Sequence, residues 1–174
     1  PALRNIETIR GTFPVFEYSQ ANVSLTGGDI DLEIKPFKGL KILSKTSLLR
    51  AWNRSQKDWL VLMPSQRFEN GVRYTFADFK KVASVYFGAS VVNVLRQTLV
   101  PANQDFAPAP PAYWLLNAEL GFDIKTKMPQ PISIHVAATN LLNQSYRDYL
   151  NRFRYFSDAQ GTNVSLRVRI PFHF

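Results

Sequence analysis

The sequence contains few side chains that could perform covalent or acid–base chemistry. It has no cysteine and two histidines, His135 and His173, so a disulfide, a thiolate metal site and a cysteine nucleophile are excluded. Glu119 and Asp123 share one face of a period-two segment, where carboxylates ion-pair with arginines or form hydrogen bonds more often than they act as acids or bases. There is no glycine-rich phosphate loop. We therefore predict no enzymatic activity, no cofactor and no metal site.

The densest run of basic and aromatic residues spans 146–156 and contains Arg147, Arg152 and Arg154. Arginines interleaved with aromatic rings bind single-stranded nucleic acid by stacking and phosphate contact. They equally contact an anionic ligand or lipopolysaccharide phosphates, or they stack on one another and stiffen a loop. The sequence leaves these alternatives open, and it makes the three arginines candidates for ligand binding.

Two other segments carry candidate residues for ligand contact. Residues 97–112 contain Asn103, Asp105 and four prolines, which predicts a stiff and partly extended loop. Trp59 lies in the segment 53–65. Because binding residues concentrate on loops, we predict that Trp59, Asn103 and Asp105 belong to ligand-binding loops.

The candidate residues lie between segments in which apolar and polar residues alternate, which is the pattern of β-strands. The alternation is clearest where every even position from Val164 to Phe174 is apolar, and no segment keeps a helical period over three turns. At Gly27 and Gly28 the alternation changes phase, which predicts a bulge or a crossing from membrane to water. The sequence predicts an all-β fold of about seven antiparallel strands. Their ranges are 22–34, 39–52, 67–76, 84–91, 113–125, 132–139 and 164–174.

The connections between the predicted strands alternate in length. Those at 35–39, 78–81 and 127–131 are short, whereas those at 53–65, 97–112 and 143–161 are long. This asymmetry is typical of transmembrane β-barrels, which have short periplasmic turns and long extracellular loops. Strands of about 10 residues or more also cross a bilayer at a tilt.

Composition fits the same class of protein. Of the 174 residues 45% are hydrophobic and 13% aromatic, and the formal net charge is +8. No run of about 18 apolar residues occurs, which excludes a transmembrane helix. Aromatic residues gather near the ends of the predicted strands, as in the aromatic girdles of membrane barrels. Lys and Arg are spread along the whole chain, so the charge predicts a basic surface and no nucleic-acid partner.

The last predicted strand ends in Ile170, Phe172 and Phe174. An alternating strand with a terminal aromatic residue resembles the C-terminal recognition signal of bacterial outer-membrane proteins. An unpaired strand of this kind is a template for strand addition. We therefore predict that these three residues form an assembly signal.

Residues 134–146 resemble the penultimate strand of TonB-dependent outer-membrane receptors. In that family an Asn-Leu-Phe-Asp-x-x-Tyr element follows an alternating strand, and this chain has Asn140-Leu-Leu-Asn-Gln-Ser-Tyr146. Leu142 and Asn143 replace the commoner Phe and Asp. Two further segments are also similar to the family: residues 146–153 and the closing strand 161–174. The strand pattern of residues 13–29, which contains a glycine and an acidic residue, is similar as well.

The resemblance implies that residues 1–174 are a C-terminal segment of a receptor barrel of about twenty-two strands, without its plug domain and TonB-contacting segment. It implies a bacterial outer-membrane location and the import of a scarce nutrient, such as an iron chelate, cobalamin or a glycan. The implied partners are outer-membrane lipid and lipopolysaccharide, the barrel-assembly machinery, TonB through the missing N-terminal part, and a siderophore-like or other small nutrient ligand.

Two alternatives remain open at this point. One is a complete small barrel of about eight strands with an anchoring or adhesion role, its additional strand drawn from residues 6–18. The other is a soluble basic β-sandwich that binds nucleic acid.

Overall fold

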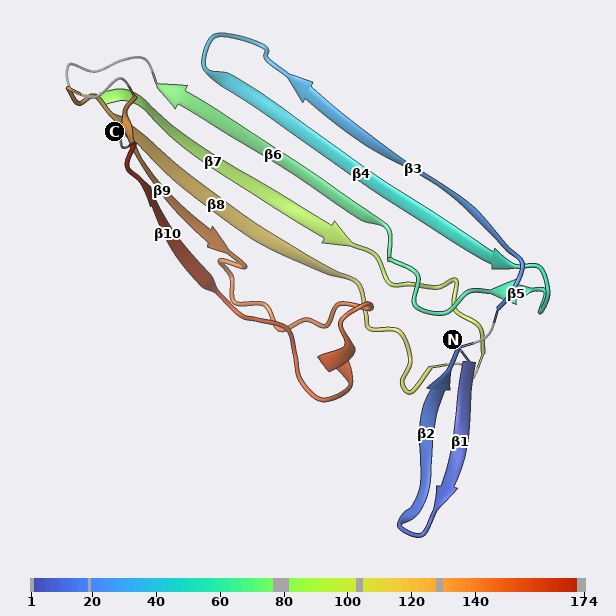
Figure 1. Ribbon diagram of the computed structural model, residues 1–174. Helices are drawn as coiled ribbons and strands as arrows, with labels where there is room; N and C mark the ends of the chain where they lie inside the picture. The colour runs from blue at the N-terminus through green and yellow to red at the C-terminus, as the bar shows by residue number, and fades with distance from the viewer. Residues whose placement is uncertain (1, 19, 77–81, 103–104, 128–129, 172–174) are drawn as a thin grey trace.

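The protein is described by a computed structural model that covers residues 2–18, 20–76, 82–102, 105–127 and 130–171. Within these residues the chain forms ten strands and one short 3-10 helix (Figure 1). No helix among them is long and apolar enough to cross a membrane. The predicted all-β class is confirmed.

Seven long strands form one continuous antiparallel sheet in the order β10-β9-β8-β7-β6-β4-β3, with β5 paired to the end of β4. Apart from β5, each strand pairs with the strands before and after it in the chain, as in a β-meander. The predicted number of main strands is confirmed, and their positions agree to within a few residues, except that the last strand ends at Arg169 and residues 172–174 of its predicted range lie outside the described residues. Their bounds are β3 Val23–Ile34, β4 Leu40–Asn53, β5 Asp58–Trp59, β6 Arg67–Phe76, β7 Val82–Val94, β8 Tyr113–Ile124, β9 Ile132–Thr139 and β10 Asn163–Arg169.

The register between the strands separates polar from apolar side chains across the whole sheet. Arg73, Gly88 and Glu119 are directly opposite one another on β6, β7 and β8, so they share one face. On the other face Tyr74 lies opposite Phe87, which in turn lies opposite Leu120. Because side chains alternate along a strand, the period-two pattern of the sequence places nearly all charged residues on the first face.

The apolar face is exposed from β3 to β10. Its large apolar residues on β3, β4, β6, β7, β8 and at β10 include many that are between 37% and 67% exposed, although apolar side chains of this size are usually buried. Others, among them the apolar residues of β9, are half-buried. No second sheet covers this face in the described part of the chain. These exposed residues are Ile30, Leu32, Ile34, Ile42, Leu48, Val72, Tyr74, Phe76, Phe87, Trp114, Val164, Leu166, Val168 and Ile170.

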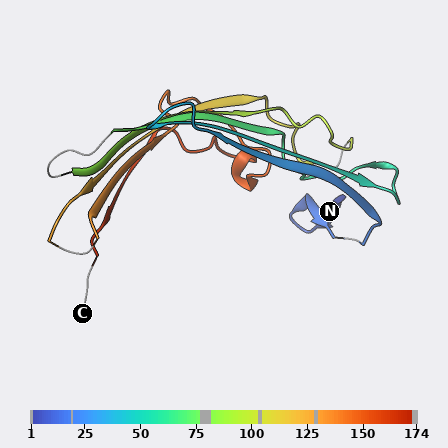
Figure 2. The same cartoon turned by 90° about the horizontal axis from the view of Figure 1, so that it is seen from above.

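Seen from above, the sheet is a single curved layer, with the 3-10 helix on its concave side (Figure 2). The polar face is the concave one, because the loop that carries this helix packs against it. A small core of Val92, Val94 and Tyr113 is buried there, with Leu115 and Tyr146 packed against it. Residues elsewhere on the sheet are mostly half-buried or exposed, so the best-packed part of the molecule lies at one end of the strands.

The two ends of the sheet differ as predicted. The connection between β3 and β4 covers only residues 35–39, while the loops after β4, β7 and β9 are long, and the long loops gather at one end of the sheet (Figure 1). The short connections at 78–81 and 127–131 lie wholly or partly outside the described residues. The bulge predicted at Gly27 and Gly28 is wrong, because β3 pairs with β4 in one uninterrupted register through both glycines.

Residues 6–18 do not supply an additional strand to the sheet. They belong to a separate hairpin of β1, Ala2–Thr8, and β2, Gly11–Glu17, which projects beyond the long-loop end of the sheet (Figure 1). The proline in β2, Pro14, is tolerated because a two-stranded ribbon leaves one side of each strand without a hydrogen-bond partner. The small-barrel alternative therefore lacks its proposed strand, and the single sheet is not the two-layered sandwich of the other alternative.

Candidate functional site

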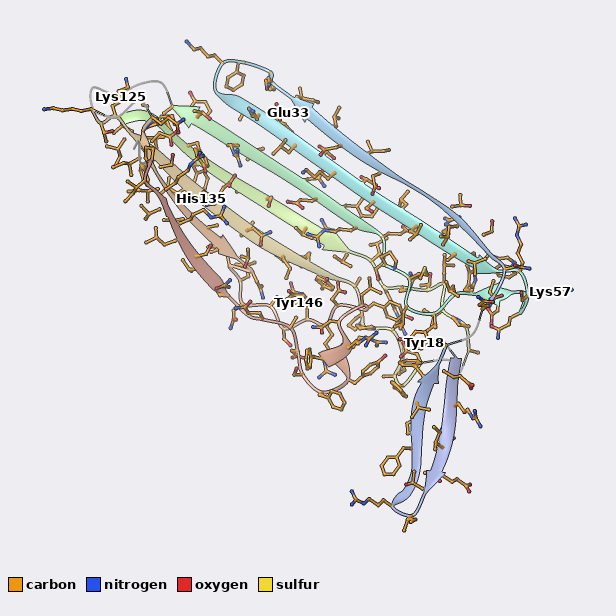
Figure 3. All side chains as sticks on the ribbon, in the orientation of Figure 1. Tyr18, Glu33, Lys57, Lys125, His135 and Tyr146 are labelled. Atoms are coloured by element: carbon orange, nitrogen blue, oxygen red, sulfur yellow. The ribbon has the colours of Figure 1, made fainter. Side chains whose placement is uncertain are left out.

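The long loops meet in one cluster at the end of the sheet. We call this the loop cluster: residues 95–102 and 105–112 between β7 and β8, residues 140–162 between β9 and β10, the segment 60–66, and residues 14–18 at the end of the hairpin. Figure 3 shows Tyr146 and Tyr18 at this end of the molecule, and His135 within the sheet. Four sets of contacts hold the cluster together.

Asn140 organises the start of the β9–β10 loop. Only 2% of this residue is exposed, and its backbone has a φ of 50°, a conformation that asparagine tolerates better than most residues. Its side chain accepts a hydrogen bond from the Gln144 backbone N–H and donates one to the Gln144 carbonyl, both at 2.9 Å. The Thr162 hydroxyl donates to the Asn140 carbonyl. Asn140 thereby fixes both ends of the loop.

Asn143 closes the same loop from the opposite side. It also has a positive φ, 49°, and its side-chain oxygen accepts a hydrogen bond from the Thr162 backbone N–H at 3.1 Å. A Cβ on Gly161 would lie 2.4 Å from this oxygen, so the close approach requires glycine. The Asn-Leu-Leu-Asn element that resembles the receptor family therefore has a physical role as a polar clamp on the loop.

Tyrosines attach the loop to the concave face of the sheet. The Tyr113 hydroxyl donates to the Asp148 carboxylate at 2.7 Å, and the rings of Tyr113 and Tyr146 are 4.5 Å apart. Tyr149 is 3% exposed, and its hydroxyl accepts from the Leu62 backbone N–H. The last contact joins the β9–β10 loop to the segment after β5.

An ion pair between Asp105 and Arg154 joins the β7–β8 loop to the β9–β10 loop. Their side chains are 6% and 2% exposed respectively. The guanidinium of Arg154 lies 4.7 Å from the ring centre of Tyr149 and 4.4 Å from that of Tyr155. Its Nε is buried without a hydrogen-bond partner in the described residues, and stacking between two ring faces partly compensates a cation at such a position.

Tyr155 completes this buried group. Its hydroxyl donates to the second oxygen of the Asp105 carboxylate and accepts from Arg154 at 3.0 Å. Burial, and then the hydrogen bond to Asp105, raise the pKa of Tyr155 from 10.0 to about 12. Burial also raises the pKa of Tyr149. Both groups therefore hold their protons at neutral pH.

A chain of aromatic rings continues from Tyr155 to the hairpin. Phe106 contacts Tyr155 edge-on at 5.4 Å and Phe16 at 4.4 Å between ring centres. A cavity of about 760 Å³ lies between the hairpin and the β9–β10 loop. We call it the aromatic cavity; it is lined by Pro14, Phe16, Tyr18, Leu62, Phe106, Tyr149, Leu150, Asn151, Arg152, Arg154, Tyr155 and Phe156.

The structure brings some of the predicted ligand-binding residues together and leaves others apart. Arg152 and Arg154 line the aromatic cavity, and Asp105 holds Arg154. Arg147 instead pairs with Asp158 at 2.6 Å, at an exposed position. Trp59 packs edge-on against Trp52, 5.0 Å between ring centres, and does not line the cavity. Asn103 lies outside the described residues.

A second polar group lies at the middle of the concave face. Arg73 donates to Glu119 through its Nε at 2.8 Å, and the other oxygen of Glu119 lies 3.3 Å from His135 Nε2. Arg73 reaches Glu119 across Gly88, where a Cβ would lie 2.7 Å from the glutamate side chain. The Asp123 carboxylate accepts from Ser84 and Ser133. Both carboxylates are thus held by neighbouring strands.

Metal ligands do not gather in the described part of the chain: it contains no group of three His, Cys, Asp or Glu side chains placed to hold an ion. His173 lies outside it. Of the predicted assembly signal, Ile170 follows β10 and is 45% exposed on the apolar face, while Phe172 and Phe174 lie outside the described residues.

Sequence reasoning missed several residues of the loop cluster. Phe16 and Phe106 line the cavity, but no sequence spacing connects them with each other or with the predicted run 146–156. Phe106 directly follows Asp105, so the aromatic residue beside a predicted ligand contact was the one available signal. The hairpin residues carried no signal of this kind.

Comparison with known proteins places the chain by its fold. No protein-family model and no curated protein matches the sequence. Among solved structures the chain is similar to the copper transporter OprC. The TM-score is 0.76 at 14% sequence identity, and the match covers 95% of this chain and 26% of that chain. The sheet and its loops therefore resemble in fold about a quarter of the OprC chain.

Proposed function

We propose that the chain is part of the wall of a bacterial outer-membrane transporter barrel of the TonB-dependent class. The observation that carries this proposal is the apolar face that runs across seven long antiparallel strands, large parts of which are exposed and which no second sheet covers in the described residues. Soluble proteins cover such a face with a second layer, whereas in a membrane barrel it contacts lipid. The fold similarity to a copper transporter supports transport as the role.

The concave face then lines the lumen. It carries Glu119 in contact with both Arg73 and His135, and polar side chains inside a barrel face either water or a plug domain. The sheet makes up less than one third of a barrel of about twenty-two strands. In this proposal the remaining strands, the plug and the TonB-contacting segment belong to other parts of the complete protein.

The loop cluster is on the extracellular side in this arrangement, and it contributes to capturing the nutrient. Its long loops are connected by a buried ion pair, which gives a binding surface more rigidity than separate loops would have. The imported nutrient is a scarce one, such as an iron chelate, cobalamin or a glycan, and energy for its release into the periplasm comes through TonB. The sheet, as part of the barrel wall, has lipopolysaccharide and the barrel-assembly machinery as its partners.

Fractionation of bacteria that produce the complete protein carrying this sequence tests the proposal. We expect it in the outer-membrane fraction, with slower gel migration after boiling than before, because a closed barrel resists detergent until heated. Recovery of the protein in the soluble fraction, folded without detergent, would contradict the proposal.

A further inference from the structure

The aromatic cavity has the size and the walls of a small-molecule site. Its volume of about 760 Å³ falls within the range of about 300–1,000 Å³ that is typical of ligand pockets. The rings of Phe16, Phe106, Tyr155 and Phe156 line it. They come from the hairpin and from both long loops, so the site exists only where these three segments meet.

The charge of the cavity comes from one arginine. Arg154 is neutralised by Asp105, and only 2% of its side chain is exposed. Arg152 also lines the cavity but is exposed, and it has no ion-pair partner among the residues that the structure describes. The cavity therefore combines apolar ring surfaces with one uncompensated positive charge.

We propose that the aromatic cavity binds a small aromatic anion, meaning a planar ring system that carries a carboxylate or a phenolate. The rings of the ligand would pack against Phe106 and Phe156, and its anionic oxygen would pair with the Arg152 guanidinium. This assignment rests on the proposed function, in which the cavity is on the outer surface of a transporter. It goes further by naming the chemistry of the ligand.

Other ligand classes fit the cavity less well. A cationic ligand would be repelled by Arg152, and the Asp105 carboxylate would not compensate this repulsion because it is already paired with Arg154. A bare metal ion would find no cluster of ligating side chains in the described residues. An aliphatic anion would satisfy Arg152 but would lose the stacking contacts that aromatic walls offer.

Calorimetric titration of the complete, detergent-solubilised protein tests this inference. The probes are naphthoate, naphthalenemethanol, which has the same rings without the charge, and cyclohexanecarboxylate, which has the charge without the aromatic rings. We expect naphthoate to bind at least about fivefold more tightly than either control.

Two variants assign the binding to this cavity. Arg152→Gln is expected to weaken naphthoate binding about fivefold and to leave naphthalenemethanol binding unchanged. Phe156→Ala removes a ring that is 84% exposed, so the fold is retained while binding of both naphthyl probes weakens. The matched controls are Arg96→Gln in the β7–β8 loop and Phe153→Ala in the β9–β10 loop. Both residues are exposed and lie outside the cavity lining, so both variants should bind the naphthyl probes as the wild type does.

The inference is overturned if naphthoate does not bind to folded protein, or if neither Arg152→Gln nor Phe156→Ala weakens its binding. Because the titration needs no transport, these results are separate from a failure of the proposed function. A protein that binds naphthoate in this way but is absent from the outer membrane would overturn the transporter assignment and retain the site.

Discussion

Asp105 and Arg154 are 49 residues apart in the sequence, and their side chains form an ion pair that is almost completely buried. The pair is the most extensively buried charged contact between two loops in the described residues. It adjoins the aromatic cavity, since Arg154 lines that cavity together with Tyr149 and Tyr155, whose rings hold its guanidinium between them. The order of the loop cluster therefore depends on charges that water does not reach.

Removing one partner of this pair should disrupt the loop cluster. Arg154→Ala leaves the Asp105 carboxylate buried without its cation, a change that costs about 3–5 kcal/mol in comparable buried pairs. We expect faster cleavage of the two loops by thermolysin, while the sheet stays intact. The double variant Asp105→Leu with Arg154→Met should recover most of the resistance, because it removes both charges and keeps apolar volume.

An exposed ion pair provides the control. Arg4 and Glu17 pair on the hairpin with side chains 64% and 56% exposed, so Arg4→Ala should change stability by less than about 1 kcal/mol. If Arg154→Ala left the loops as resistant as Arg4→Ala does, the buried pair would not be what orders the cluster.

Replacing Asn140 should open the β9–β10 loop. Asn140→Ala leaves the Gln144 N–H and C=O without their side-chain partner at a site that is 2% exposed, and it places alanine at a φ of 50°. We expect a loss of about 2 kcal/mol or more in the free energy of unfolding, measured by urea denaturation in detergent. Asn143→Asp keeps the oxygen that accepts from Thr162 and should be close to neutral; a large loss there would argue against the clamp.

Two glycines of the sheet should respond differently to alanine. A Cβ at Gly121 would lie 2.1 Å from the Tyr86 ring, whereas a Cβ at Gly28 would meet nothing within 4 Å. Gly121→Ala should therefore displace Tyr86 from the concave face and cost about 1–3 kcal/mol. Gly28→Ala should be tolerated. Thermal unfolding of the two variants in the same detergent compares them, and equal midpoints would contradict the packing described for Tyr86.

A charge on the apolar face should prevent membrane assembly. Phe87 lies near the middle of β7 and is 49% exposed on the apolar face. Phe87→Arg places a charge in lipid, which costs about 2–4 kcal/mol near the centre of a bilayer. The control is Ser90→Arg, three residues along the same strand on the concave face. We expect heat-modifiable gel migration to be lost for Phe87→Arg alone; its loss for both, or for neither, would argue against the proposed lipid-facing side.

The loop cluster should lose stability at high pH through Tyr155. Its pKa is raised to about 12, so the folded cluster holds this proton more tightly than the open loop does. The resulting stabilisation is complete below pH 10.0, the ordinary value, and is lost as the pH rises toward 12. Tyrosinate absorbance should therefore show a late-titrating group that Tyr155→Phe removes. A wild-type titration identical to that of the variant would contradict the assigned hydrogen bond to Asp105.

Strand positions could be predicted from the sequence because the alternation records which side of the sheet each residue faces. The predicted ranges 113–125 and 132–139 agree with β8 and β9 to within one residue. The hairpin was missed, because its strands are short and largely exposed and the second is interrupted by Pro14, so no face of it carries a clear apolar pattern.

The contacts within the candidate site could be predicted less well. The arginines of 146–156 were found by composition, but the partner of Arg154 is in another loop, and only the folded chain brings Asp105 to it. The contact between Arg73 and Glu119 depends on the register of three strands and on the absence of a side chain at Gly88. The alternation within a strand shows which side each residue faces, but it does not show which residue of the neighbouring strand lies opposite, because that also depends on the geometry of the turns.

The neighbour-to-neighbour order of the sheet also has a kinetic consequence. Each long strand pairs with the strands next to it in the chain, so each pairing closes only the one connection between them and costs less loop-closure entropy than a pairing between distant strands would. The sheet can therefore grow by successive hairpins, each using the edge of the last as a template. Phe16 meets Phe106 across 90 residues, and contacts of such large sequence separation form late. We therefore expect the wall to be complete before the cavity takes its final shape.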